Sequence, residues 1–291
     1  MEDKLVKAIS ESGNYRIMVC NTTELTELAR QKHQTLPTAS AALGRTLAVA
    51  VLMAGNLKDP QEKISICIDG GGPLGRIMVR SYQDLRVKGF VTNSDVFLIN
   101  EETGKLDVAQ AVGKNGFLSV TRDLGLKQAF SGQVELVSGE LGQDFAYYFN
   151  VSEQTPSLVG VGVLVDVDNS VKAAGALMVQ ILPTTQDEEI NKLEEVARNL
   201  PAISSLFAEN TDLVDIVKMV DPQAKIIGEG KPYFACECSK EKMLAALTTL
   251  DVADLQSMID DYQGCKSHCQ YCNTYYQVSA QELEAIIKEK A

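Results

Sequence analysis

Five of the seven cysteines in this 291-residue chain lie between residues 236 and 272, and this crowding constrains the fold more than any other feature of the sequence. Four of them form two close pairs, a CxC at Cys236 and Cys238 and a CxxC at Cys269 and Cys272. Four thiolates suit one tetrahedral Zn²⁺ and leave no open coordination position, which is typical of a structural zinc site rather than a catalytic one. An odd total of seven also argues against a framework in which every cysteine is paired.

The last 60 residues, 232–291, form the unit that this site would hold together. A unit of this size has a core worth about 3–5 kcal/mol, whereas a structural zinc contributes an apparent ~10–16 kcal/mol. Metal binding should therefore dominate folding of the unit, and oxidation of the thiolates would expel the metal and unfold it. Spacing alone favours a purely structural zinc, and the alternative is that the same site also senses oxidants.

The remaining cysteines need separate assignments. Cys265 and His268 precede the CxxC and could form a competing CxxH pair, although we favour the four cysteines of the two close pairs as the ligands. Cys20 and Cys67 lie in apolar contexts, which predicts buried core residues rather than reactive thiols.

Residues 1–182 are predicted to form a mixed α/β body. Alternating apolar residues on either side of a glycine-rich turn predict a hairpin over residues 64–79, and a second hairpin is expected over residues 157–182. A proline predicts the start of an apolar helix at residue 37, and Asn21 with a glutamate three residues later predicts a capped helix before it. The glycine-rich turn formally matches a dinucleotide-binding fingerprint, but the strand-like run after it favours a turn.

Residues 183–231 are predicted to be a helical linker with acidic faces, carrying ten acidic and five basic residues. Thr185 and Glu188 form a capping-box pattern ahead of a narrow apolar stripe. Because a short amphipathic helix is marginal alone, this segment should hold its shape only while packed on a neighbouring domain. Three further helices are expected in the cysteine-rich unit, the last of them capped by Ser279 and Glu282. The predicted fold class is α+β: a mixed α/β N-terminal domain, a helical linker and a small C-terminal zinc-binding domain.

Charge and hydropathy exclude two classes of partner. The formal net charge of −12 repels phosphate backbones, so no binding to nucleic acid is expected. The longest strongly apolar stretch, residues 47–54, is far shorter than the ~20 residues of a membrane-spanning helix, and the first ten residues lack the apolar core of a signal peptide. We therefore expect a cytoplasmic protein with no membrane partner, and in that reducing compartment clustered cysteines indicate metal or redox chemistry.

Several longer segments accompany the two cysteine pairs in a specific order. They begin at residues 33, 69, 135, 152, 234 and 269, and they read HQTLPTASAALGRTL, DGGGPLG, ELVSGELGQDFAYYF, SEQTPS, FACECS and CQYCN. Together they resemble the Hsp33 family of redox-regulated holdase chaperones over nearly the whole chain. The resemblance implies no enzymatic activity. It implies a client-binding and dimerising body (1–182), a metastable linker (183–231) and a zinc redox switch (232–291).

The resemblance also implies how the cysteines act. Oxidation would expel one zinc per chain, form Cys236–Cys238 and Cys269–Cys272 disulfides, and unfold the switch and the linker. The active form would be a homodimer that binds unfolded client proteins and prevents their aggregation under oxidative stress. Cys265 departs from the family pattern and leaves open which thiols pair under oxidation.

Two other function classes are weaker alternatives. An oxidoreductase would use Cys269 and Cys272 as a thioredoxin-like CxxC, but the βαβ context of that motif is missing here. A zinc-binding nucleic-acid module should be basic, whereas residues 232–291 carry nine acidic and five basic side chains. One tightly bound zinc per chain, released with loss of four free thiols, would fit the chaperone and not the oxidoreductase.

Overall fold

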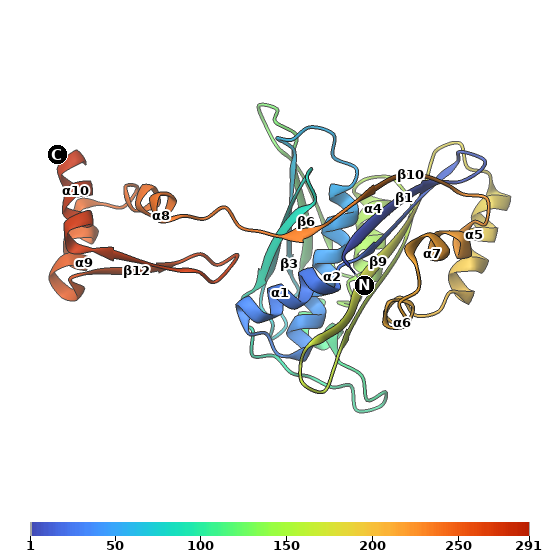
Figure 1. Ribbon diagram of the computed structural model, residues 1–291, viewed down its shortest axis with the longest axis horizontal. Coiled ribbons are helices and arrows are strands. Elements are labelled where there is room, and N and C mark those ends of the chain that lie inside the picture. The colour runs from blue at the N-terminus through green and yellow to red at the C-terminus, as the bar shows by residue number, and fades with distance from the viewer. Residues whose placement is uncertain (1, 291) are drawn as a thin grey trace. The chain divides into compact units, whose positions relative to one another are not determined.

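The computed structural model describes residues 2–290, which divide into two compact units (Figure 1). The first unit extends to Phe234, and the second begins at Ala235. Both units contain helices and strands, so the predicted α+β class is confirmed. The predicted linker, residues 183–231, lies within the first unit.

The first unit contains a five-stranded and a six-stranded sheet. In spatial order the five-stranded sheet consists of β10 (Lys225–Gly230), β1 (Lys4–Ile9), β2 (Tyr15–Asn21), β9 (Val171–Ile181) and β8 (Ser157–Val165). The six-stranded sheet consists of β11 (Tyr233–Phe234), β5 (Arg86–Val91), β4 (Ile77–Tyr82), β3 (Lys63–Asp69), β6 (Phe117–Asp123) and β7 (Phe130–Glu135). All neighbouring strands are antiparallel except β11 and β5. The two predicted hairpins, β3–β4 and β8–β9, are confirmed, and the glycine-rich turn leads into a strand rather than a helix.

Helix α2 (Pro37–Ala54) forms the centre of the first unit and contacts strands of both sheets (Figure 1). All of its residues except Arg45 are buried, which explains why it is apolar on every side. It is also long and apolar enough to cross a membrane, but 94% of the apolar window is buried inside the protein. The helix predicted to start at Pro37 is therefore confirmed as a core element. Two of the shorter helices of this body are α3 (Val108–Val112) and α4 (Gly142–Val151).

Helix α1 (Thr23–His33) is present as predicted, but its cap differs from the local one expected. The Asp3 carboxylate accepts the backbone N–H groups of Glu24 at 2.9 Å and Leu25 at 2.7 Å. Asn21 accepts the backbone N–H and the hydroxyl of Thr23, the first residue of the helix, rather than the N–H of Glu24. Burial raises the pKa of Asp3 to about 6, although the helix N–H groups act to lower it. The predicted pairing of Asn21 with Glu24 was wrong, because Asp3, 21 positions away from Glu24, accepts the Glu24 N–H.

The linker forms three helices followed by strand β10: α5 (Asp187–Asn199), α6 (Ile203–Ala208) and α7 (Leu213–Val220). Helix α5 begins two residues after Thr185, and Glu189 rather than Glu188 accepts the backbone N–H of Gln186. The predicted capping pair is therefore shifted by one residue. Strand β10 pairs with β1, so the last part of the linker completes the five-stranded sheet.

Helix α6 packs closely on a track of glycines in the β8–β9 hairpin. Gly162 pairs directly with Gly175 across the two strands. A Cβ atom at Gly162 would lie 2.4 Å from the backbone nitrogen of Ser204, and one at Gly175 would lie 2.3 Å from the Phe207 ring. Only glycine permits this approach, because any larger residue would overlap the helix. The hairpin is thus shaped to receive the linker.

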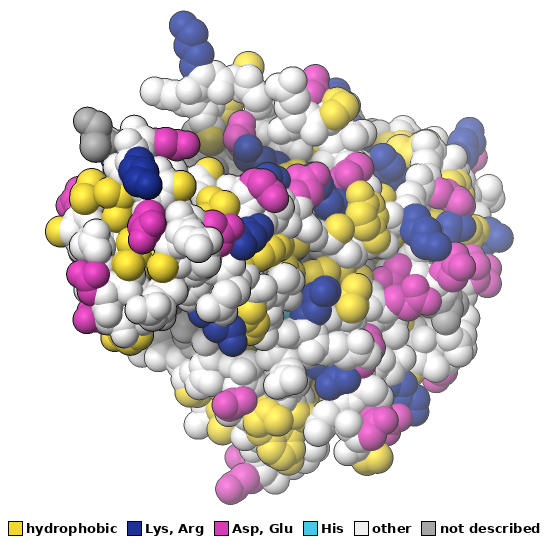
Figure 2. All heavy atoms as spheres, turned by 60° about the vertical axis from the view of Figure 1, so that its left-hand side comes forward, with side chains coloured by type: hydrophobic (Ala, Val, Ile, Leu, Met, Phe, Trp, Pro, Cys, Tyr) yellow, Lys and Arg dark blue, Asp and Glu magenta, His cyan; other side chains and the backbone are white. Residues whose placement is uncertain are grey.

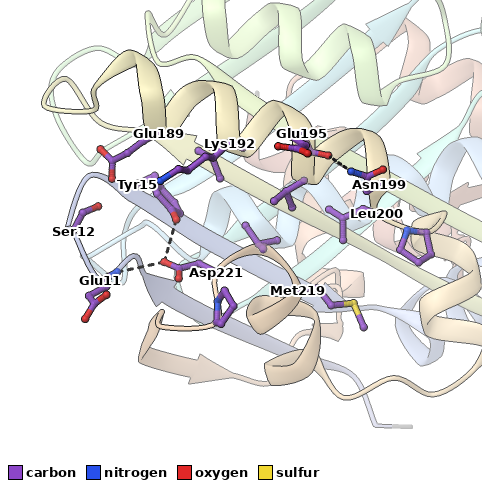
Figure 3. A pocket seen from close by; sticks show the side chains of 15 residues that line it. Glu11, Ser12, Tyr15, Glu189, Lys192, Glu195, Asn199, Leu200, Met219 and Asp221 are labelled. Carbon is purple, nitrogen blue, oxygen red and sulfur yellow. Dashed lines mark hydrogen bonds between the residues drawn. The ribbon is translucent and has the colours of Figure 1, made fainter.

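A cavity of about 730 Å³ lies between α5, α7 and the β1–β2 hairpin (Figure 3). At its edge the Asp221 carboxylate accepts the Tyr15 hydroxyl at 3.0 Å and the Glu11 backbone N–H at 3.4 Å. Asn14 donates to the Glu189 carboxylate at 2.6 Å. These polar contacts tie both ends of the helical linker segment to one hairpin. Beneath them, apolar side chains of α5–α7 share a buried cluster with β1, β2 and β9.

The second unit contains three helices and a two-stranded sheet: α8 (Lys240–Leu247), α9 (Val252–Tyr262), β12 (Gly264–His268), β13 (Tyr275–Ser279) and α10 (Ala280–Lys290). The three predicted helices are confirmed, whereas the hairpin was not predicted. The expected cap of α10 is present, because the Glu282 carboxylate accepts the Ser279 N–H at 2.9 Å. The buried core in the described part of this unit is small and consists of Leu255, Val278, Leu283 and Ile286.

Candidate metal centre

The β12–β13 hairpin places Cys269 and Cys272 in the tight turn that joins its strands. The Cys269 carbonyl accepts the backbone N–H of Cys272 at 3.3 Å and of Asn273 at 2.8 Å, and the Cys269 N–H donates to the Thr274 carbonyl. Asn273 has a φ of 55°, a left-handed conformation that asparagine tolerates. The turn therefore directs both sulfurs to one side.

The other close pair lies in irregular backbone between β11 and α8. Lys242, in the first turn of α8, donates its ammonium to the Glu237 carbonyl at 2.6 Å, between the two cysteines of the CxC. Ser239 caps the same helix by accepting the Lys242 N–H. Cys238 therefore directly precedes the N-cap residue of α8, and Lys242 of α8 fixes the backbone between the two cysteines of the CxC.

The four sulfurs meet in one cluster. The Sγ atoms of Cys236, Cys238, Cys269 and Cys272 all lie within 4.8 Å of one another, with distances of 3.7 Å between Cys236 and Cys269 and 3.2 Å between Cys238 and Cys272. A tetrahedral ion with metal–sulfur bonds of about 2.3 Å separates its sulfurs by about 3.8 Å. The all-sulfur donor set suits a thiophilic ion and not calcium or magnesium. The residues present therefore fit a metal held by four thiolates.

The electrostatics of the cluster also favour a cation at its centre. Burial raises the pKa of Cys269 to about 12 and raises that of Cys238. Burial acts in the same direction on Cys272, but hydrogen bonds with Thr274 and with neighbouring thiols lower its pKa to about 7. Thiolates this close repel one another, and a divalent cation between them removes that repulsion. Metal binding is therefore coupled to the release of thiol protons.

Two hydroxyl groups from β13 and the residue before it contact the sulfurs. Tyr276 donates its hydroxyl to Cys238 Sγ at 3.1 Å, and the Thr274 hydroxyl lies 3.3 Å from Cys272 Sγ. Analysis of the sequence missed both residues. Thr274, Tyr276 and Val278 are each two residues apart, and residues at this spacing lie on the same face of a strand. Because Val278 is buried in the core of the unit, this spacing is the signal that would have placed both hydroxyls on the inner face.

Cys265 and His268 lie outside the four-sulfur cluster. Cys265 pairs with Val278 across the hairpin and packs at the edge of the small core. His268 stacks on the Tyr275 ring at a centroid distance of 5.3 Å. Residues three apart in a strand point to opposite faces, so these two side chains do not form the competing CxxH pair.

The two cysteines of the first unit differ from each other. Cys20 is buried, and its thiol donates to the Ala48 carbonyl at 3.4 Å, which confirms the prediction of a core residue. Cys67 is half-buried because it alternates in β3 with Ile66 and Ile68, which face the core. The core prediction for Cys67 was therefore wrong. Burial raises the pKa of both thiols, so neither is an activated nucleophile.

Comparisons with known proteins match the chain from end to end. The family model described as Hsp33 protein matches residues 3–279. The 33 kDa chaperonin of Bacillus licheniformis is 44% identical over 288 residues, covering 99% of both chains. That of Geobacillus kaustophilus is 43% identical, covering 98% of both. The crystal structure of the 33 kDa chaperonin (Heat shock protein 33 homolog) from Thermotoga maritima has a TM-score of 0.92 at 37% identity, covering 100% of this chain and 99% of its own.

These matches place the chain among the chaperones rather than the enzymes, and a cluster of four thiols suits a redox-regulated member of that class. The chain belongs to the Hsp33 family, as the resemblance of its sequence indicated.

Proposed function

We propose that this chaperone is a holdase switched on by oxidation, in which a bound zinc ion keeps the reduced form inactive. The observation that carries the proposal is the cluster of four sulfurs within 4.8 Å, in a unit whose described core has four buried apolar side chains. A structural zinc contributes an apparent ~10–16 kcal/mol, far more than so small a core can supply. Losing the metal would therefore unfold the second unit, which begins at Ala235.

The proposed zinc ligands are Cys236, Cys238, Cys269 and Cys272, and the proposed disulfides are Cys236–Cys238 and Cys269–Cys272. Each disulfide takes two electrons from two thiolates, and an oxidant such as a peroxide is reduced to water. All four sulfurs are near enough for disulfides within the CxC and CxxC pairs or between them, since Cys236 lies 3.7 Å from Cys269 and Cys238 lies 3.2 Å from Cys272. Peptide mapping of the oxidised protein decides between them, and a disulfide that includes Cys265 would contradict the assignment.

The linker is the proposed second part of the switch. Leu193 is the buried residue of α5, and α6 and α7 span six and eight residues, so these helices depend on their packing for stability. Two residues before Cys236, the chain is held by the short strand β11, in which Tyr233 bonds Asp84 at 2.8 Å and Phe234 is buried. We propose that unfolding of the C-terminal unit weakens this anchor and frees the linker.

Release of the linker would expose apolar surface on both the linker and the sheet that it covers. Such surface is what an unfolded client protein binds. We also propose that the active form is a homodimer and that the protein works in the cytoplasm without binding nucleic acid or membranes. The net charge of −12 supports the exclusion of nucleic acid, and basic and acidic side chains are interspersed on the face shown in Figure 2.

One oxidised sample tests the proposal. Treatment with peroxide and mild heat, or with hypochlorous acid, should release one zinc per chain, consume four thiols and suppress light scattering by a thermally aggregating client. Cys269→Ser should lose the zinc, whereas Cys67→Ser removes a thiol outside the cluster and should behave as the parent. Equal suppression by the reduced and oxidised parent protein would refute the switch.

A further inference from the structure

Tyr276 is not one of the proposed zinc ligands, but its hydroxyl contacts one of them directly. It donates to Cys238 Sγ at 3.1 Å, across 38 residues of sequence. Cys238 Sγ also lies 3.2 Å from Cys272 Sγ. The hydroxyl of Tyr276 therefore acts on a sulfur that is itself in contact with another sulfur of the cluster.

The hairpin holds Tyr276 in this position through its ring and backbone. Tyr276 pairs with Ser267 across the two strands, and its side chain lies on the face that also carries the buried Val278. The ring is half-buried, so replacement by phenylalanine keeps the packing and removes only the oxygen atom. The neighbouring Tyr275 faces the other way, is 55% exposed and stacks on His268.

We infer that Tyr276 is a positioning residue that protects Cys238 from oxidants and so sets the threshold of the redox switch. A hydrogen bond to a thiolate withdraws charge from sulfur and lowers its nucleophilicity. It also fixes the orientation of the ligand, as outer-shell partners of metal ligands do. This inference rests on the proposed function, because it concerns the rate at which the same cluster is oxidised.

The protected step is attack of the Cys238 thiolate on a peroxide. Sulfur bonds to one peroxide oxygen, the O–O bond breaks, and the leaving hydroxide takes a proton to become water while Cys238 becomes a sulfenic acid. A second cluster thiolate then displaces the sulfenic oxygen, which leaves as water with a further proton, and a disulfide forms. Two electrons pass from the two sulfurs to the peroxide, and the hydroxyl of Tyr276 slows the first step by stabilising the attacking thiolate.

The test compares Tyr276→Phe and Tyr275→Phe with the parent as full-length, reduced, zinc-loaded chains. The readout is the second-order rate constant for thiol loss and zinc release with hydrogen peroxide. Tyr276→Phe should react about three- to tenfold faster, because part of a hydrogen bond to a charged group is lost on reaching the transition state. Tyr275→Phe should react at the parent rate.

A second measurement separates tuning from a merely structural effect. In Co²⁺-substituted protein, the sulfur-to-cobalt charge-transfer band of Tyr276→Phe should move to longer wavelength, while the visible bands of tetrahedral cobalt are retained. Parent-like rates together with a parent-like band would overturn the inference, and so would slower oxidation of Tyr276→Phe. Failure of peroxide to oxidise the parent cluster would instead overturn the proposed switch itself.

Discussion

A single methyl group added at Gly162 should loosen the linker without touching the metal centre. The new Cβ would lie 2.4 Å from the backbone nitrogen of Ser204 and 2.9 Å from its Cα, in the first turn of α6. Ordinary carbon contacts begin near ~3.5 Å, so the helix must move outward by roughly 1 Å. The backbone of Ser204 cannot rotate away as a side chain can. The overlap therefore reduces the free energy with which the whole of α6 packs on the hairpin.

The size of the effect follows from this overlap. Overpacking of a close contact typically costs about 1–3 kcal/mol, which would raise the population of released linker by a factor of about 5–150. Amide hydrogen exchange in α6 and α7 of reduced, zinc-loaded Gly162→Ala should accelerate by that factor. The variant should also suppress client aggregation partially without an oxidant, because the linker is released while the zinc remains bound.

Gly160→Ala is the matched control on the same strand and face. Its Cβ would meet the side chain of Ile203 at 2.8 Å, and that side chain can adopt another rotamer. Exchange in Gly160→Ala should therefore change less than in Gly162→Ala. Unchanged amide exchange in α6 of Gly162→Ala would refute the close packing of α6 on the hairpin. Faster exchange without any client binding would refute the proposal that the linker covers the client-binding surface.

Three further predictions concern the metal, the small core and pH. Chelation of the metal under reducing conditions should abolish the helical circular dichroism of residues 235–290 and leave the body before the linker, residues 2–182, folded, and zinc should restore it. Leu255→Ala should destabilise the C-terminal unit by about 2–5 kcal/mol and speed metal loss to a chelator, whereas the exposed Val252→Ala should not. A hydrogen bond from Arg30 lowers the pKa of Glu27 to about 2, so its contribution to stability is present above pH 4.5 and is lost as pH falls toward 2. Melting temperatures of Glu27→Gln should therefore fall less steeply than those of the parent over that range, and parallel curves would contradict the assignment.

Local chemistry explains which features could be predicted from the sequence. The CxC and CxxC pairs are recognisable because thiolate ligands must stand close together along the chain to reach one ion. The β3–β4 and β8–β9 hairpins were predictable because their turns and their alternation are encoded within a few residues. The cap of α10 was predictable for the same reason, since Ser279 and Glu282 are three residues apart.

Contacts between distant residues escaped prediction. The N–H groups of Glu24 and Leu25 in α1 are bound by Asp3, which precedes strand β1, so the local pairing of Asn21 with Glu24 was misleading. Cys67 appeared apolar in context, although its alternation with Ile66 and Ile68 already places it on the face of β3 that points away from the core. Strand β10 carries little alternation of its own and becomes a strand because β1 offers an unpaired edge.

The α+β class, the ligand set that we propose for zinc, and membership of the Hsp33 family could all be recognised before the structure was known. The way in which that site and the linker are held became visible in the packed chain, through the hydroxyl of Tyr276 on Cys238 and through the glycines beneath α6. Ligand type and turn geometry are properties of neighbouring residues. A hydrogen bond across 38 residues, or a missing Cβ under a helix, has meaning only once the packed chain brings the two partners together.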